Sequence, residues 1–162
     1  MDIDKRLAAV AAQREELIAK FGWMVQSVFP TAESPGDCFA YSIGLHTQGL
    51  PELIALGLPM EVGTALINDV ARQLLAHKVE GRGLPIGQMA LERWPMPVYL
   101  LEADASTARE LAVGADRRSA GQANYVQLCW PDKGGHFPWE AACSPAIQRL
   151  QALLGPPPVV LH

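Results

Sequence analysis

The sequence lacks the features that mark several common classes of protein. Only 19% of its 162 residues are charged, and 13 basic against 17 acidic side chains give a net charge of −4. This balance lacks the basic footprint of a nucleic-acid-binding protein, so we expect no nucleic-acid partner. Its apolar runs fall well short of the roughly 20 residues that span a bilayer, so we expect no membrane segment. At 49% hydrophobic, the chain is large and apolar enough to fold as one domain without a disulfide or a metal.

Cysteine is also scarce. Cys38, Cys129 and Cys143 are odd in number and far apart, which gives no sign of a disulfide framework and fits a reducing compartment. Charged residues recur through the first 21 positions, so these positions lack the unbroken apolar stretch of a signal peptide. We therefore expect a cytoplasmic protein whose cysteines are small buried side chains.

Familiar signatures of catalysis and metal binding are missing too. The sequence contains neither a Gly-x-Ser-x-Gly nucleophile elbow nor a glycine-rich phosphate loop. His46, His136, Cys129 and Cys143 do not form the closely spaced ligand pairs of structural zinc sites, so we predict no metal site. Cys129 falls within an apolar strand pattern, where we expect an inert thiol.

Hydrophobic periodicity predicts an α+β domain with a mixed, mostly antiparallel sheet flanked by helices. We expect helices over residues 2–21, 59–78, 104–113 and 146–154, and strands over 23–29, 38–45, 52–58, 98–102 and 125–130. We expect loops over 30–37, 81–96 (with one short strand) and 114–123. The N-terminal helix within residues 1–22 and the core over 23–154 would form the single domain, and 155–162 would be a proline-rich tail.

Two motifs resemble those of one known family. The first is Phe39-Ala-Tyr-Ser-Ile-Gly-Leu45, followed by Gly49-Leu-Pro-Glu-Leu53 and Gly57-Leu-Pro59; the second is Gln127-Leu-Cys-Trp-Pro-Asp132, followed by Gly135-His-Phe-Pro-Trp-Glu140. Together they resemble the bacterial family catalogued as domain of unknown function 4262, over roughly residues 20 to 154. The chain departs from the family pattern at Ser42, where threonine is usual, and at Leu50, where histidine is expected. The resemblance implies the family's fold and brings no settled activity.

Two turns carry the side chains that suggest a site. Trp130, Phe137 and Trp139 indicate either a rigid aromatic wall for a planar ligand or a rigid corner that plugs the end of the sheet. If the strands that end in the two turns are neighbours, a polar cluster would face this aromatic floor, which is the usual composition of a small-molecule site. The candidate ligand-binding residues are His46, Glu52, Trp130, Asp132, His136, Trp139 and Glu140.

These observations favour a binding or interaction domain, without a cofactor, whose small-molecule or protein partner sits beside the Trp130–Trp139 wall. The alternative is an FMN-dependent oxidoreductase of split-barrel type, acting as a homodimer. A strand, a Gly-Leu-Pro turn, a returning strand and a helix that opens on Pro59 have the outline of such a barrel. The hairpin lacks an obvious phosphate clamp, so loop arginines such as Arg82 would have to supply the charge. A third hypothesis is an immunity or regulatory partner of another bacterial protein.

Overall fold

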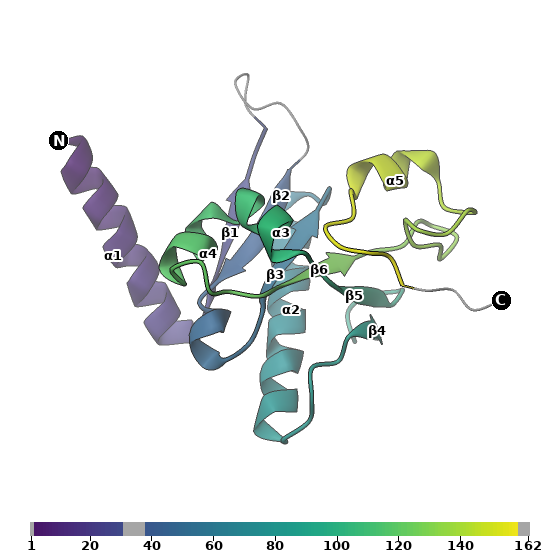
Figure 1. Cartoon of the computed structure of the whole chain (residues 1–162), viewed down its shortest axis with the longest axis horizontal. Helices are drawn as coiled ribbons and strands as arrows, with labels where there is room; N and C mark the ends of the chain where they lie inside the picture. The colour runs from purple at the N-terminus through teal and green to yellow at the C-terminus, as the bar shows by residue number, and fades with distance from the viewer. Residues whose placement is uncertain (1, 31–37, 159–162) are drawn as a thin grey trace.

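A six-stranded mixed sheet forms the centre of the molecule. The structure, a computed structural model, describes residues 2–30 and 38–158 (Figure 1). The strands, which lie in the order β1-β2-β3-β6-β5-β4, are β1 (Met24–Val28), β2 (Phe39–Ile43), β3 (Glu52–Leu56), β4 (Gly87–Met89), β5 (Val98–Glu102) and β6 (Tyr125–Cys129). The β3–β6 pair is parallel and the other pairs are antiparallel. The predicted α+β class and mostly antiparallel sheet are therefore confirmed, and the sheet is open, with β1 and β4 at its edges, instead of closing into a split barrel.

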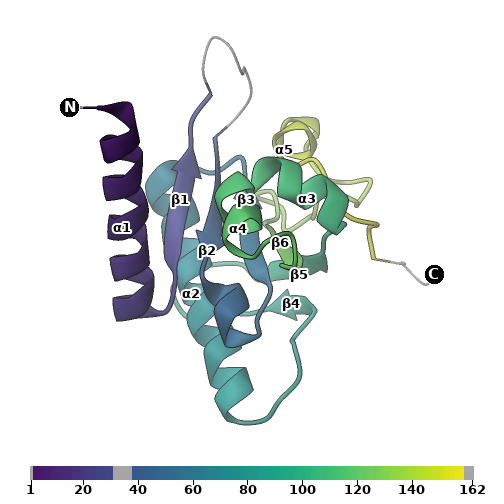
Figure 2. The ribbon, with the colours of Figure 1, turned by 60° about the vertical axis from the view of Figure 1, so that its left-hand side comes forward.

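Helices cover both faces of this sheet. On one face α2 (Met60–Val79) packs against β1, β2 and β3, and on the other lie α3 (Ala105–Leu111) and α4 (Val113–Arg118). Figures 1 and 2 show α1 (Ile3–Phe21) running beside the β1 edge, and α5 (Pro145–Leu150) beyond the end of β6. Within the described ranges, every helix is too short or too polar to cross a membrane.

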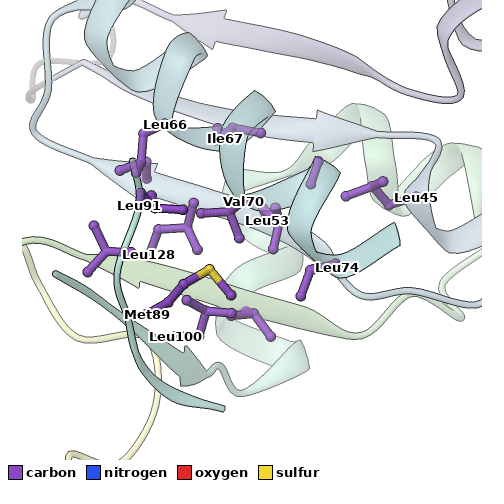
Figure 3. Packing of buried hydrophobic residues seen from close by; sticks show 14 of the residues in the cluster. Leu45, Leu53, Leu66, Ile67, Val70, Leu74, Met89, Leu91, Leu100 and Leu128 are labelled. Carbon is purple, nitrogen blue, oxygen red and sulfur yellow. The ribbon is translucent and has the colours of Figure 1, made fainter. Parts of the chain in front are cut away.

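The hydrophobic core is divided between the two faces because successive side chains of a strand point in opposite directions. Leu53, Leu74 and Leu128 belong to the cluster under α2, where each is at most 1% exposed (Figure 3). On the other face Ile54 belongs to the same cluster as the fully buried Ala108 of α3. The small alanine side chains of this second cluster let α3 and α4 lie close to the sheet.

The second and third strands pair as the expected antiparallel hairpin, and the turn between them contains a 3-10 helix, η1 (Leu45–Gln48). Two other local predictions were wrong. The predicted loop over 114–123 begins with α4, which burial of Ala115 and a hydrogen bond from the Gly114 N–H to the Tyr41 hydroxyl (3.0 Å) stabilise. The last helix ends at Leu150, before its expected end at 154, because the backbone of Ala152 and Leu154 bonds to Gln127 of β6 instead of continuing the helix. Of the predicted loop over 30–37 and tail over 155–162, residues 31–37 and 159–162 lie outside the described residues.

Candidate functional site

A buried carboxylate organises the turn between β2 and β3. Glu52 is 1% exposed, and its oxygens accept hydrogen bonds from the backbone N–H groups of Gly44 (2.9 Å), Leu45 (3.1 Å) and His46 (3.4 Å). The Ser42 hydroxyl donates a fourth hydrogen bond at 2.8 Å. Burial raises the pKa of Glu52 above its usual range, and the four hydrogen bonds oppose that shift. With its oxygens occupied, this carboxylate is placed to fix the start of η1 from inside the fold.

The second motif folds back on itself through Asp132. Its Oδ1 accepts hydrogen bonds from the backbone N–H groups of Gly134 (3.0 Å) and His136 (2.9 Å), and its Oδ2 accepts one from the Ser144 N–H (2.9 Å). The imidazole Nδ1 of His136 lies 3.3 Å from the same Oδ1. This is the local bonding by which aspartate stabilises tight turns. Asp132 therefore holds both ends of its loop.

The aromatic residues of this motif pack on one another. The rings of Phe137 and Trp139 are stacked, with centroids 5.1 Å apart and planes 9° apart. Tyr99 of β5 meets Trp139 edge-on at 4.8 Å. The indole N–H of Trp130 donates to the last carbonyl of β3 (2.8 Å), and the Phe137 N–H donates to Glu140 Oε2 (2.6 Å). We name the segment from Trp130 to Glu140 the aromatic corner.

Two buried glutamines join the C-terminal segment to the aromatic corner and to β6. Gln151 exchanges two hydrogen bonds with the backbone of Trp130, at 2.9 and 2.7 Å. Gln127 donates to the Ala152 carbonyl (2.9 Å) and accepts from the Leu154 N–H (2.8 Å). Because both side chains are at most 1% exposed, their amides replace the backbone partners that a longer helix or a further strand would have provided.

The two turns identified in the sequence lie at opposite ends of the sheet. β3 and β6 run parallel, and Glu52 is opposite Tyr125, so both strands begin at the same end. The turn that carries His46 leads into β3, of which Glu52 is the first residue, whereas the aromatic corner follows β6. Strands of this length separate the two turns by about 15 Å. The seven candidate residues therefore form two groups, and the polar cluster facing an aromatic floor does not arise.

Asp132 gives the aromatic corner a pH dependence. Hydrogen bonds from the backbone N–H groups of His136 and Ser144 hold the pKa of Asp132 below its usual range. In the unfolded chain an aspartate has a pKa of about 3.9, so the stabilisation that ionised Asp132 gives to the folded chain is fully present above that pH. It is lost as the pH falls through the lower pKa of the folded chain. We expect Asp132→Asn to flatten the acid loss of stability, measured by urea unfolding from about pH 2 to about pH 7.

The control for this experiment is Glu110→Gln, which removes one carboxylate from the exposed surface of α3. We expect this variant to keep the steep acid limb of the parent protein. An Asp132→Asn variant with an equally steep acid limb would contradict the role given to Asp132.

An open cavity of about 820 Å³ lies at the end of the sheet where β3 and β6 begin. This volume falls within the range of about 300–1,000 Å³ that is typical of small-molecule sites. Its walls come from η1, the last turns of α2, the segment after α2, the end of β5 and the start of β6. The polar residues that line it are His46, His77, Lys78, Arg82, Glu102 and Asn124, and Leu50, Leu74 and Val126 contribute apolar surface.

The lining of this cavity is basic although the chain as a whole is acidic. It has two cationic side chains, Lys78 and Arg82, two histidines, His46 and His77, and one carboxylate, Glu102. The Lys78 ammonium donates to the Gln48 carbonyl, which ties α2 to η1. Arg82 pairs with Glu80, but both side chains are more than half exposed, so this ion pair is weak and easily exchanged for another anion. The dipole of any helix favours basic residues in its last turn, so basic residues at the end of α2 are ordinary. Arg82 lies beyond that turn, so the dipole does not account for it.

Two of the three cysteine thiols, those of Cys129 and Cys143, are buried. Cys129 is 0% exposed, and burial raises its pKa to about 12, so the thiol stays protonated near neutral pH. Burial also raises the pKa of Cys143. Across residues 2–30 and 38–158, no three His, Cys, Asp or Glu side chains gather so that they could hold a metal ion.

Sequence reasoning found His46 and missed most of this cavity. The sequence suggested Arg82 only as a source of charge for a flavin phosphate, and it suggested neither Lys78 nor Asn124 as a site residue. These residues come from separate segments of the chain, and their spacing carries no motif. The one available signal was the position of Lys78 at the C-terminal end of a strongly periodic helix.

Comparison with known proteins places the chain in a family. No curated protein and no solved structure matches the chain. The family model named DUF4262 and described as Domain of unknown function matches residues 17–144. The matched region contains all the residues that line the cavity and the whole aromatic corner, and it confirms the resemblance carried by the two motifs. Because the match covers well over half of its length, the chain belongs to the family described as Domain of unknown function (DUF4262).

Proposed function

We propose that this protein is a binding domain whose ligand, a small organic anion, occupies the cavity at the start of β3 and β6. The observation that carries the proposal is the concentration of basic side chains around a cavity of about 820 Å³ in a protein of net charge −4. A concave site with an apolar surface and a few convergent polar groups is the usual form of a small-molecule site.

The lining favours a ligand with a charged end and an apolar body. Lys78 and Arg82 would contact a carboxylate or phosphate, because hydrogen bonds between ionised groups are roughly twice as strong as neutral ones. Leu50 and Val126 would contact the apolar part. The Glu52 carboxylate, which binds the first N–H groups of η1, holds the backbone that presents His46 to the cavity.

We propose a structural role for the aromatic corner, where the sequence had suggested the ligand. Asp132 and Glu140 accept hydrogen bonds from the backbone of their own loop. The ring of Trp139 packs on Phe137 and Tyr99. Groups that are satisfied internally in this way contribute little to the recognition of a ligand.

FMN belongs among the ligands to be tested, because its phosphate is an anion and the cavity is large enough for a molecule of that size. A flavin-dependent oxidoreductase is thus the second candidate function. The open sheet gives this candidate no support from the fold. A native mass spectrum of freshly purified protein separates the binding domain from the flavin enzyme, since a bound flavin adds its own mass. A bound flavin would also colour the purified protein yellow.

The proposal is tested by titration calorimetry with a panel of aliphatic and aromatic carboxylates, phosphate esters, FMN and neutral amides of the same shape. We expect anions to bind and the neutral amides to bind much more weakly. Lys78→Gln and Arg82→Ala should each raise the dissociation constant about tenfold or more, because each removes one charge-assisted contact. Affinity should also fall as salt is added.

The matched control is Arg149→Ala, which removes an exposed cation from α5, away from the cavity. We expect this variant to bind as the parent protein does. Thermal unfolding of each variant shows whether a loss of binding reflects a loss of fold, since Lys78 also holds Gln48. If no anion in the panel binds, or if Arg149→Ala weakens binding as much as Arg82→Ala, the proposal is wrong.

A further inference from the structure

The helix α1 carries an apolar stripe that stays largely exposed. The side chains of the stripe are Ile3 (71% exposed), Leu7 (63%), Val10 (54%), Leu17 (38%) and Phe21 (57%). Single exposed apolar residues are ordinary, but a row of five along one helix is typical of an interaction surface.

Only the C-terminal half of α1 is attached to the rest of the described chain. Ile18 is buried, Glu15 pairs with Arg118 of α4 (2.8 Å), and the Gln48 side chain donates to the Gly22 carbonyl (2.8 Å). Figure 1 shows the N-terminal turns of α1 extending outward from the β1 edge of the sheet. The first half of the stripe is therefore presented away from the body of the molecule.

The spacing of the stripe indicates what covers it. Positions 3, 7, 10, 14, 17 and 21 alternate intervals of four and three residues, which is the seam of a two-stranded coiled coil. These intervals read the same in both directions. A second, reversed α1 would therefore meet the first layer for layer, with Ile3 against Phe21 and Leu7 against Leu17 of the other copy. Arg14 is the one polar residue of the seam; its guanidinium donates to the Gln26 side chain of β1 in its own chain (3.5 Å), and it lies opposite Val10 in this register.

A groove beside α1 matches this arrangement. It has a volume of about 330 Å³ and is lined in part by Leu17, Phe21, Trp23 and Val25, so it continues the second half of the stripe towards β1. In the reversed register, this half faces the first turns of the second copy. The groove of each copy would thus receive Ile3 and Leu7 of the other.

We propose that the protein forms a homodimer in which two α1 helices pair antiparallel along this stripe, each seating its first two turns in the groove of the other copy. The contact is isologous, because each copy contributes the same surface and a two-fold axis closes the assembly. If the exposed parts of these five side chains are covered in both copies, the pair buries on the order of 1,000 Å², the lower bound of a specific interface. Ile3, Leu7 and Val10 lie outside the residues that the family model matches.

The oligomeric state of the full chain tests the proposal. In sedimentation equilibrium at about 50 μM, we expect twice the chain mass of 17.5 kDa. Leu7→Glu places a charge in the seam twice per dimer and should raise the dissociation constant of the dimer about 100-fold or more. Ala9→Glu adds the same charge on the opposite side of the helix and should leave the dimer intact. Circular dichroism shows whether each variant keeps its helices.

Two results would overturn the homodimer. One is a parent protein that remains at 17.5 kDa over the whole concentration range. The other is a Leu7→Glu variant that dimerises as the parent does, since the contact would then lie elsewhere.

Cross-linking tests the antiparallel arrangement, in a Cys38→Ser background because Cys129 and Cys143 are buried. Gln13 lies near the two-fold axis of the reversed register, so a short bis-maleimide should join two copies of Gln13→Cys. The two copies of Arg6→Cys would be about 18 Å apart along the helices, beyond the reach of the same reagent. Efficient cross-linking through Arg6→Cys instead of Gln13→Cys would overturn the antiparallel arrangement.

Discussion

Replacing Glu52 with alanine is expected to lower the free energy of unfolding by about 4 kcal/mol, because two buried backbone N–H groups, one partly buried N–H group and the Ser42 hydroxyl lose their acceptor. A buried donor that is left without a partner costs about 1–3 kcal/mol, and water cannot easily reach a position that is 1% exposed. For a domain of this size, the loss corresponds to a fall of about 10 °C in Tm. Urea and thermal unfolding at neutral pH measure both quantities.

Glu52→Gln separates the charge of this side chain from its shape. The glutamine keeps one carbonyl oxygen for the N–H groups of η1, so we expect a smaller loss of about 2 kcal/mol. The pKa of Glu52 is raised in the folded chain, so folding favours its protonated form. The part of its stabilisation that is linked to protonation is therefore present below the usual glutamate pKa of about 4.3 and falls as the pH rises through the raised folded value. Glu52→Gln should remove that dependence.

The matched control for both variants is Glu92→Gln, which removes an exposed carboxylate from the segment between β4 and β5. A surface substitution of this kind is expected to change stability by less than about 0.5 kcal/mol. A Glu52→Ala protein as stable as Glu92→Gln would contradict the assignment of Glu52 to the interior of the fold. It would return this residue to the list of candidate ligand contacts.

Periodicity predicted the regular elements well because burial on one side imposes a repeat on the sequence. The strand expected over 98–102 coincides with β5, and the helix expected over 2–21 differs from α1 by one residue. Periodicity failed to predict the short elements, which are stabilised by single long-range contacts. α4 depends on the Tyr41 hydroxyl and on buried alanines, and the early end of α5 depends on Gln127 of β6. Neither contact has a local sequence pattern.

The location of the site could not be predicted, since it depends on one parallel pair of strands. If β3 and β6 were antiparallel, the turn before β3 and the aromatic corner after β6 would lie at the same end of the sheet, as the sequence analysis supposed. The parallel register of Glu52 with Tyr125 places them at opposite ends and brings Asn124 and Glu102 to the basic cavity instead.

The motifs that identified the family largely hold the fold in place. Gly44 has a φ of 114°, a conformation that favours glycine, and a side chain there would come within 2.9 Å of Ile18 in α1. Asp132 and Gln127 satisfy backbone groups of the C-terminal segments. A recognisable motif of this kind reports the architecture of the family and says little about what its members bind.

Trp139→Ala is expected to lower the free energy of unfolding by about 3 kcal/mol, the lower end of the range for truncation of a large aromatic residue, because Trp139 is only partly buried. The substitution removes the stacked contact with Phe137 and the edge contact with Tyr99. Trp139→Phe keeps a ring in the same place and should lose less than about 1.5 kcal/mol. Thermal and urea unfolding measure both changes.

The binding of anions by the folded variants decides between the two roles of the aromatic corner. The basic cavity lies at the other end of the sheet, so the affinity of folded Trp139→Ala for anions should equal that of the parent protein when both are measured well below the lowered Tm. An unchanged Tm combined with lost binding would mean that the corner holds the ligand and that its packing is incidental. Because stability and affinity are measured on the same variant, a structural corner and a binding corner predict opposite pairs of results.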